Sequence, residues 1–338
     1  MASSVPEPGL RLAGISPRAY QHPADRAATA ALGAIPKLDL VVRKLIELGY
    51  ERALRQAYLG SSVRVGEQQL AQVWALHRQV VQALDLDEVP ALYLTAFPLA
   101  NAITIGAQRP IVVLHSELVT LLDADGRRVV LAHEAAHIHS EHVLYRTALT
   151  ILLALGTTVA RLPLIAGLPL LAVRAALLEW SRAAELSCDR AAALVTGQPL
   201  HVCRTLMTIA GGAAADELSL DAFMAQGMDY EEGSKGLERL ARLFSDLNLT
   251  HPMPVRRTHE LMRWVRTGEY DRILAGEYAR RGEERPPRDE ATAAAHHYGE
   301  RVRRAFEDAA NSVNEAGDQL ADVRRRVDDW LGGRRGEG

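Results

Sequence analysis

The stretch VVLAHEAAHIHSEHVLY, residues 129–145, places four histidines and two glutamates inside an otherwise apolar run. The spacing of its apolar residues predicts a buried helix. A buried imidazole needs a hydrogen bond or a metal ion, and burying a carboxylate costs still more free energy. His133 and His137 are four residues apart and therefore share one face of a helix, with Glu134 beside them. We expect these three residues to serve one common site.

Their spacing is that of an H-E-x-x-H motif, in which two histidines bind zinc and the glutamate takes a proton from water. A surface helix with scattered histidines is the alternative, and the apolar residues around the motif argue against it. We therefore predict one Zn²⁺ per chain, bound by His133 and His137, with Glu134 as the general base for peptide hydrolysis. His139 and His142 are expected to point away from the metal.

A catalytic zinc needs a third protein ligand and an open position for water. A third histidine six residues after His137 is excluded, because Val143 stands there. The segment EWSRAAELSCDRAAALV, residues 179–195, offers Glu185 instead, with Glu179 as a weaker competitor. Asp189 follows Glu185 by one helical turn and is predicted to accept a hydrogen bond from a ligating histidine. A solvated helix face is the alternative for this pair of carboxylates.

The amino-acid composition limits the class of protein to which this chain can belong. The 338 residues are 48% hydrophobic and 24% charged, as in an ordinary globular protein. A net charge of -3 gives no general attraction to nucleic acid, so no nucleic-acid partner is expected. Two cysteines, Cys188 and Cys203, make no disulfide framework and suit a reducing compartment. The first 35 residues lack the pattern of a secretory signal. These observations predict a cytoplasmic protein that is not secreted.

The patterns predict a mainly α-helical α+β fold. Residues 1–36 are predicted to be an N-terminal arm, 37–281 the main domain, 282–293 a linker and 294–332 an amphipathic helix.

Within the main domain, apolar spacing predicts two helices between Leu38 and Leu84. Three short β-branched segments then predict a small antiparallel sheet beside the motif helix: ALYLT (91–95), NAITIG (101–106) and PIVVLH (110–115). Asp125 is predicted to cap the motif helix, and the chain after Arg146 is expected to be helical almost throughout.

Residues 147–173 are mostly apolar, and Arg161 is their only charged residue. One membrane crossing would put His137 and Glu185 on opposite sides of a bilayer, and the stretch is too short for two. Two alternatives stay open: a shallow hairpin attached to the inner face of the cell membrane, or a buried helical pair. Pro163 and Pro169 are expected to interrupt any straight helix.

The C-terminal tail carries apolar and small residues at alternating spacings of four and three from Val302 to Trp330. This heptad pattern predicts a long helix that self-associates or docks on a partner. A lone amphipathic helix packed on the main domain is the alternative.

Taken together, these segments resemble the HtpX and CAAX-prenyl-protease type of zinc metallopeptidase. The matching stretches are NAITIG, PIVVLHSELVTLLD, VVLAHEAAHIHSEH, SRAAELSCDRAA and THPMPVRR. The resemblance implies a zincin-type domain that cleaves protein or peptide substrates, with His133, His137 and Glu185 as zinc ligands. Two positions depart from the family pattern, Ala136 in place of glycine and Cys188 in place of alanine, and both residues are small.

The resemblance also implies a substrate-binding edge strand that pairs with an extended peptide, formed by Asn101, Ala102, Ile103 and Thr104. His251 falls where the family has a histidine near the cleft, either as an oxyanion donor or merely as a residue that begins a helix. Arg257 is expected to be a structural ion-pair partner. The alternative function is a zinc-stabilised scaffold or chaperone-like binder that does not cleave, but such a protein would have no need of Glu134.

Overall fold

The computed structural model describes residues 11–33, 50–154, 164–232 and 253–283. The chain divides into two units, Met1–Pro287 and Arg288–Gly338, and the whole second unit lies outside the described residues. The predicted helix 294–332 and most of the predicted linker are therefore not described and stay predictions.

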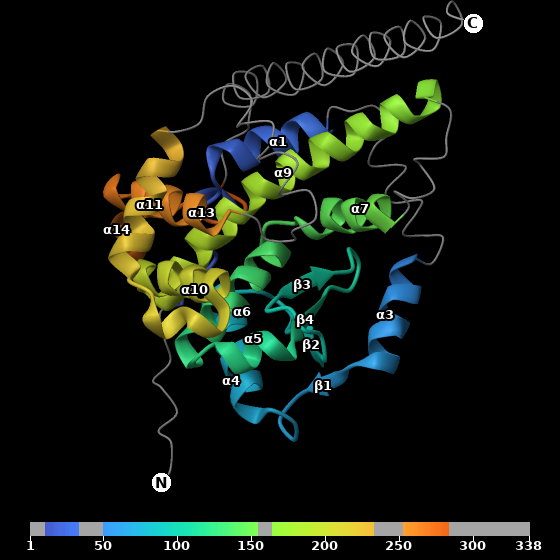
Figure 1. The fold of residues 1–338 in the computed structure, drawn as a ribbon, viewed down its shortest axis with the longest axis horizontal. Coiled ribbons are helices and arrows are strands. Elements are labelled where there is room, and N and C mark those ends of the chain that lie inside the picture. Colours follow the sequence, from blue (N-terminus) through green and yellow to red (C-terminus); the bar gives the residue numbers. More distant parts are fainter. Residues whose placement is uncertain (1–10, 34–49, 155–163, 233–252, 284–338) are drawn as a thin grey trace, which may run out of the picture. The chain divides into compact units, whose positions relative to one another are not determined.

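The described part of the first unit is mainly helical, as predicted, with one small sheet (Figure 1). Its helices are α1 (Pro23–Gly33), α3 (Tyr50–Ser61), α4 (Ala71–Ala83), α5 (Ser116–Leu121), α6 (Ala124–His139), α7 (Val143–Ala154), α9 (Leu164–Thr196), α10 (Pro199–Gly211), α11 (Leu220–Glu232), α13 (Pro254–Arg266) and α14 (Glu269–Leu274). Short 3-10 helices span Pro17–Ala19 and Gly212–Glu217, and the strands are β1 (Val63–Val65), β2 (Ala91–Thr95), β3 (Ala102–Ile105) and β4 (Ile111–His115).

The sheet is mixed, so the prediction of a purely antiparallel sheet is wrong. Its strand order is β1-β2-β4-β3, with β2 and β4 parallel and the other two pairs antiparallel. Gly106, at a φ of 95°, lies in the turn that folds β4 back onto β3. β4 lies between β3 and β2 and runs antiparallel to β3 and parallel to β2. The three predicted strands are present, and β1 is a strand that the sequence pattern did not reveal.

The motif helix α6 begins two residues earlier than expected. Its N-cap is Asp123, whose carboxylate accepts a hydrogen bond from the backbone N–H of Gly126 at 2.8 Å. Asp125, the predicted cap, lies in the first turn instead. The helix is buried from Val129 to His137. α6 therefore forms the centre of the core, packed against α4, α9 and α10.

The N-terminal segment differs from the predicted arm. From Arg11 on, the chain packs into the core, and Leu12, Ile15 and Tyr20 are at most 1% exposed. Helix α1 lies along α9 (Figure 1). Ile15 also forms a β-bridge with Arg280, so the beginning of the described chain is tied to its end.

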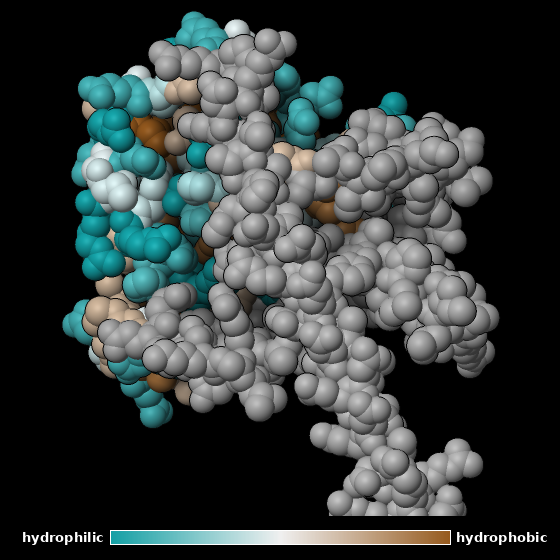
Figure 2. Space-filling model, turned by 90° about the horizontal axis from the view of Figure 1, so that it is seen from above, coloured by the Kyte–Doolittle hydropathy of each residue, from teal (hydrophilic) through white to brown (hydrophobic). Residues whose placement is uncertain are grey.

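The apolar stretch 147–173 contains the end of α7 and the beginning of α9, and its middle, residues 155–163, is not described. Helix α9 includes Pro169, so the expected interruption at this residue is wrong. None of the helices in the described ranges combines the length and apolar character needed to cross a bilayer. Where Figure 2 shows described residues, the surface is mostly hydrophilic, with a few small apolar areas.

Candidate metal centre

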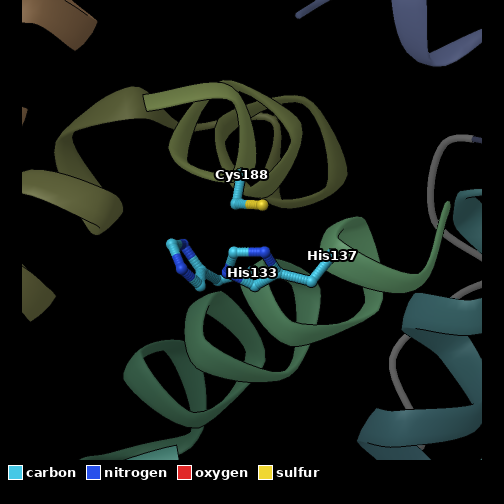
Figure 3. A group of neighbouring side chains, drawn as sticks. All are labelled: His133, His137 and Cys188. Carbon is cyan, nitrogen blue, oxygen red and sulfur yellow. The ribbon is translucent and has the colours of Figure 1, made fainter. Parts of the chain in front are cut away.

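The predicted site lies between α6 and α9. His133 and His137 project from α6 toward α9, and Cys188 faces them from that helix (Figure 3). All three side chains are buried and offer ligand atoms within 4.8 Å of one another. Glu185, one turn before Cys188, is also buried, with 1% exposure. The helix pair thus brings together the residues that the sequence predicted as ligands and one thiol that it did not.

The Glu185 carboxylate faces both histidines. Its Oε2 atom lies 3.2 Å from the Nε2 atom of His133, and its Oε1 atom lies 3.4 Å from the Nε2 atom of His137. Two imidazole nitrogens and one carboxylate are the donor set that zinc takes in one class of catalytic sites, with a fourth position left for water. The donor chemistry of these residues therefore fits a zinc ion.

Cys188 and Glu185 compete for the place of the third donor, and their contacts separate them. The Cys188 Sγ atom lies 3.7 Å from the Nδ1 atom of His142, which in turn lies 3.1 Å from the Nδ1 atom of His137. The Glu185 oxygens instead approach the Nε2 atoms of His133 and His137. Burial raises the pKa of the Cys188 thiol, which disfavours the thiolate that a metal requires. Glu185 is the better candidate ligand.

On its other side, His133 meets an ion pair. Its Nδ1 atom lies 3.1 Å from Oδ1 of Asp189, and Arg257 donates to both oxygens of that carboxylate at 2.7 and 2.6 Å. Nη1 of Arg257 also lies 3.3 Å from Oε2 of Glu185. Asp189 and Arg257 thus lie beside His133 and Glu185, the candidate ligands.

The charges around the two histidines differ, and so do the shifts of their pKa values. Burial lowers the pKa of His133, but the Glu185 charge and the hydrogen bond to Asp189 outweigh burial and raise it to about 9. Burial and the nearby charge of Arg146 lower the pKa of His137 well below its ordinary value. A metal ligand must be a neutral imidazole, so metal binding would release the proton held at His133.

Arg146 is a site residue that the sequence analysis missed. Its guanidinium Nη1 atom contacts the Nε2 atom of His137 and lies 3.5 Å from Oε1 of Glu185. It is one turn into α7 and 7% exposed. The sequence did contain a signal for this role, namely a basic residue within an apolar stretch. An arginine is rarely buried in a core unless it is paired with an acidic group.

His142 was expected to be a satisfied surface or core histidine that does not share the zinc, with its ring turned away from His137. It is a hydrogen-bonded core histidine, but the expected orientation of its ring is wrong, because its Nδ1 atom lies 3.1 Å from that of His137. The expected orientation assumed one continuous helix, whereas α6 ends at His139 and Glu141 adopts a left-handed conformation with a φ of 58°. The turn brings the His142 ring to His137. His139 does point elsewhere, with its Nδ1 atom 2.6 Å from the hydroxyl of Tyr20.

Glu134, the predicted base, is 1% exposed and faces β3. Its Oε2 atom accepts a hydrogen bond from the hydroxyl of Thr104 at 2.7 Å. Among the described strands β3 pairs with β4 alone and so forms an edge of the sheet. Asn101 precedes this strand, and Ala102 and Ile103 begin it. The predicted substrate strand therefore lies beside the predicted base.

Two candidates remain without a described side chain. His251 lies outside the described residues, and the side chain of Glu179, in α9, is not described either. Their roles stay predictions.

With this geometry in place, the comparisons with known proteins decide the family. Residues 67–265, more than half of the chain, match the sequence model of peptidase family M48. The chain belongs to this family. The resemblance to the HtpX and CAAX-prenyl-protease type is thereby confirmed, and the chain is a metallopeptidase that acts on protein or peptide substrates.

A relative in Arabidopsis thaliana, named plastoglobule-localized metallopeptidase 48, chloroplastic, supports this assignment. It is 35% identical over 260 residues, which cover 75% of this chain and 74% of the relative. No solved structure matches the chain. The relative's name gives a chloroplast location, and this finding overturns the cytoplasmic location expected from the sequence.

Proposed function

We propose that this M48 member is a zinc-dependent metalloendopeptidase in which His133, His137 and Glu185 hold one Zn²⁺ and Glu134 is the general base. The observation that carries the proposal is the approach of both Nε2 atoms to opposite oxygens of the Glu185 carboxylate, at 3.2 and 3.4 Å. Zinc, when bound, lowers the pKa of a coordinated water and polarises the scissile carbonyl.

The protein residues then supply proton transfer and orientation. Glu134, next to His133 in the chain, accepts a proton from the attacking water and returns it to the leaving amine. Asp189 accepts the Nδ1 proton of His133, so that Nε2 carries the lone pair that a metal needs. Arg257 holds Asp189 by two hydrogen bonds and keeps that carboxylate in place.

An extended peptide would pair with the edge strand β3. Such pairing uses backbone hydrogen bonds, which suit many sequences and leave the scissile bond near the strand. In this proposal residues 101–104 bind the substrate, and His251 is the candidate donor to the oxyanion of the tetrahedral intermediate.

The proposal is tested by Glu134→Gln, which removes the base while keeping the size of the side chain. Wild type and variant are brought to equal zinc content and given an unfolded protein as substrate. The variant should retain zinc and lose cleavage by a factor of about 10² or more. Equal cleavage by both proteins would contradict the proposal, and cleavage by neither would favour the non-cleaving scaffold.

A further inference from the structure

Behind His137, on the side away from Glu185, a second set of buried residues forms a continuous hydrogen-bonded chain. The Nδ1 atom of His137 lies 3.1 Å from Nδ1 of His142, and Nε2 of His142 lies 3.0 Å from Oδ2 of Asp25. Asp25 also accepts hydrogen bonds from the hydroxyls of Ser187 at 2.6 Å and Thr29 at 3.2 Å. All but Thr29 are at most 2% exposed.

The protons of this chain have one consistent arrangement when His137 binds a metal through Nε2. Its Nδ1 then carries the proton and donates to Nδ1 of His142, which must be unprotonated there. His142 in turn carries its proton on Nε2 and donates it to Asp25. The hydrogen bond at one ring nitrogen fixes which other nitrogen is left for the metal. The buried carboxylate of Asp25 thus selects the tautomer of His137 through an intervening imidazole.

Two features of the fold build this arrangement. The left-handed turn at Glu141 ends α6, and the backbone N–H of His142 donates to the carbonyl of His137 at 2.9 Å. Helix α1 packs on α9, where Ser187 holds the Asp25 carboxylate. Asp25 lies before residues 67–265, which match the family model, so a helix outside the matched region reaches the centre.

We infer that Asp25, acting through His142, is a positioning residue for the candidate ligand His137, and that α1 is thereby part of the metal site. The inference rests on the proposed function, since it requires His137 to be a ligand. In this arrangement each candidate histidine ligand is oriented by a buried carboxylate. His133 is hydrogen-bonded to Asp189 directly, and His137 is linked to Asp25 through the ring of His142. Groups that orient a metal ligand in this way typically change metal affinity by about 10- to 100-fold when they are removed.

The test measures zinc affinity in the full-length protein by competition with a chromogenic chelator, with the visible spectrum of the Co²⁺-substituted protein as a second readout. Asp25→Asn and His142→Phe should each weaken zinc binding by about tenfold and alter the Co²⁺ spectrum. His142→Gln should keep part of the affinity, because its amide can accept from His137 and donate to Asp25.

Tyr20→Phe is the matched control. It removes another buried hydrogen bond between the N-terminal segment and α6, the one to His139, outside this chain of residues. It should bind zinc within about twofold of wild type, whatever its effect on unfolding. The inference is overturned if Asp25→Asn and His142→Phe bind zinc as tightly as Tyr20→Phe does. If wild type binds no zinc, or His137→Ala binds it equally well, the proposed metal site itself is wrong.

Discussion

The hydroxyl of Thr104 lies 2.7 Å from the Oε2 atom of Glu134, and this hydrogen bond joins the edge strand of the sheet to the candidate base on α6. Thr104 is fully buried and Glu134 is 1% exposed. The same hydroxyl lies 3.2 Å from the backbone carbonyl of Glu134, but its single proton is better placed for the shorter contact. The strand that would hold the substrate therefore also orients the candidate base.

Thr104→Val should lower kcat by about tenfold while leaving KM and zinc content near wild type. A general base typically accelerates a reaction by about 10²- to 10⁴-fold, and a misaligned base loses part of this rate enhancement. Valine has the shape of threonine without the donor. Thr104→Ser restores the hydroxyl and should recover most of kcat. Steady-state kinetics on a fluorogenic peptide check both. A serine variant as slow as the valine variant would show that the methyl group, and not the hydrogen bond, matters.

Glu185→Gln and Cys188→Ala separate the two candidates for the third ligand, one turn apart on α9. Glu185→Gln should lose most of the zinc, since an amide oxygen binds zinc far more weakly than a carboxylate. Cys188→Ala should keep zinc, because burial raises the pKa of the thiol and its Sγ atom contacts the Nδ1 atom of His142 at 3.7 Å. Metal content after dialysis at fixed free zinc is the measurement. Loss of zinc from Cys188→Ala alone would assign the ligand to the thiol.

Arg257→Lys tests whether the paired hydrogen bonds to Asp189 matter beyond charge. Lysine keeps the positive charge but cannot donate to both carboxylate oxygens in the planar geometry of a guanidinium. We expect zinc affinity to fall by about tenfold, because Asp189 and with it His133 lose their fixed orientation. Chelator competition measures this, and affinity equal to wild type would reduce the role of Arg257 to charge alone.

His77, on α4, provides a pH effect away from the metal centre. Burial lowers its pKa below the ordinary 6.5, against the raising effect of its hydrogen bond to the carbonyl of Pro90. Below about pH 6.5 the unfolded chain therefore binds a proton that the folded chain resists, and the free energy of unfolding falls as pH falls.

The corresponding variant is His77→Gln, which can still donate to Pro90 but does not titrate. Urea unfolding at about pH 7.5 and about pH 5.5 should show a smaller loss of stability in the variant than in wild type. Zinc release affects both proteins alike and cancels in the comparison. Identical losses would show that His77 does not contribute.

The heptad pattern of the tail predicts that residues 294–338 are separate from the catalytic unit. Deleting them should leave zinc binding and peptide cleavage intact and change the mass of the assembly, as measured by light scattering. A truncated protein that unfolds or loses zinc would show instead that the tail is part of the core.

The sequence by itself determined the local features of this protein. The four-residue spacing of His133 and His137 places both on one helix face, and three β-branched segments become strands, because these properties depend on periods of 3.6 and 2 residues. The predicted neighbours Glu185 and Asp189 follow the same helical rule on a second helix. The H-E-x-x-H motif also indicated a metallopeptidase before any contact was known.

Tertiary structure alone decided which distant residues meet. Asp25 and His142 are 117 positions apart, and no periodicity relates them. The place of β4 between β2 and β3, the turn at Glu141 and the approach of Thr104 to Glu134 likewise depend on how whole elements pack. A contact between distant residues results from the burial of many apolar side chains at once, so its energy is not carried by any short stretch of sequence.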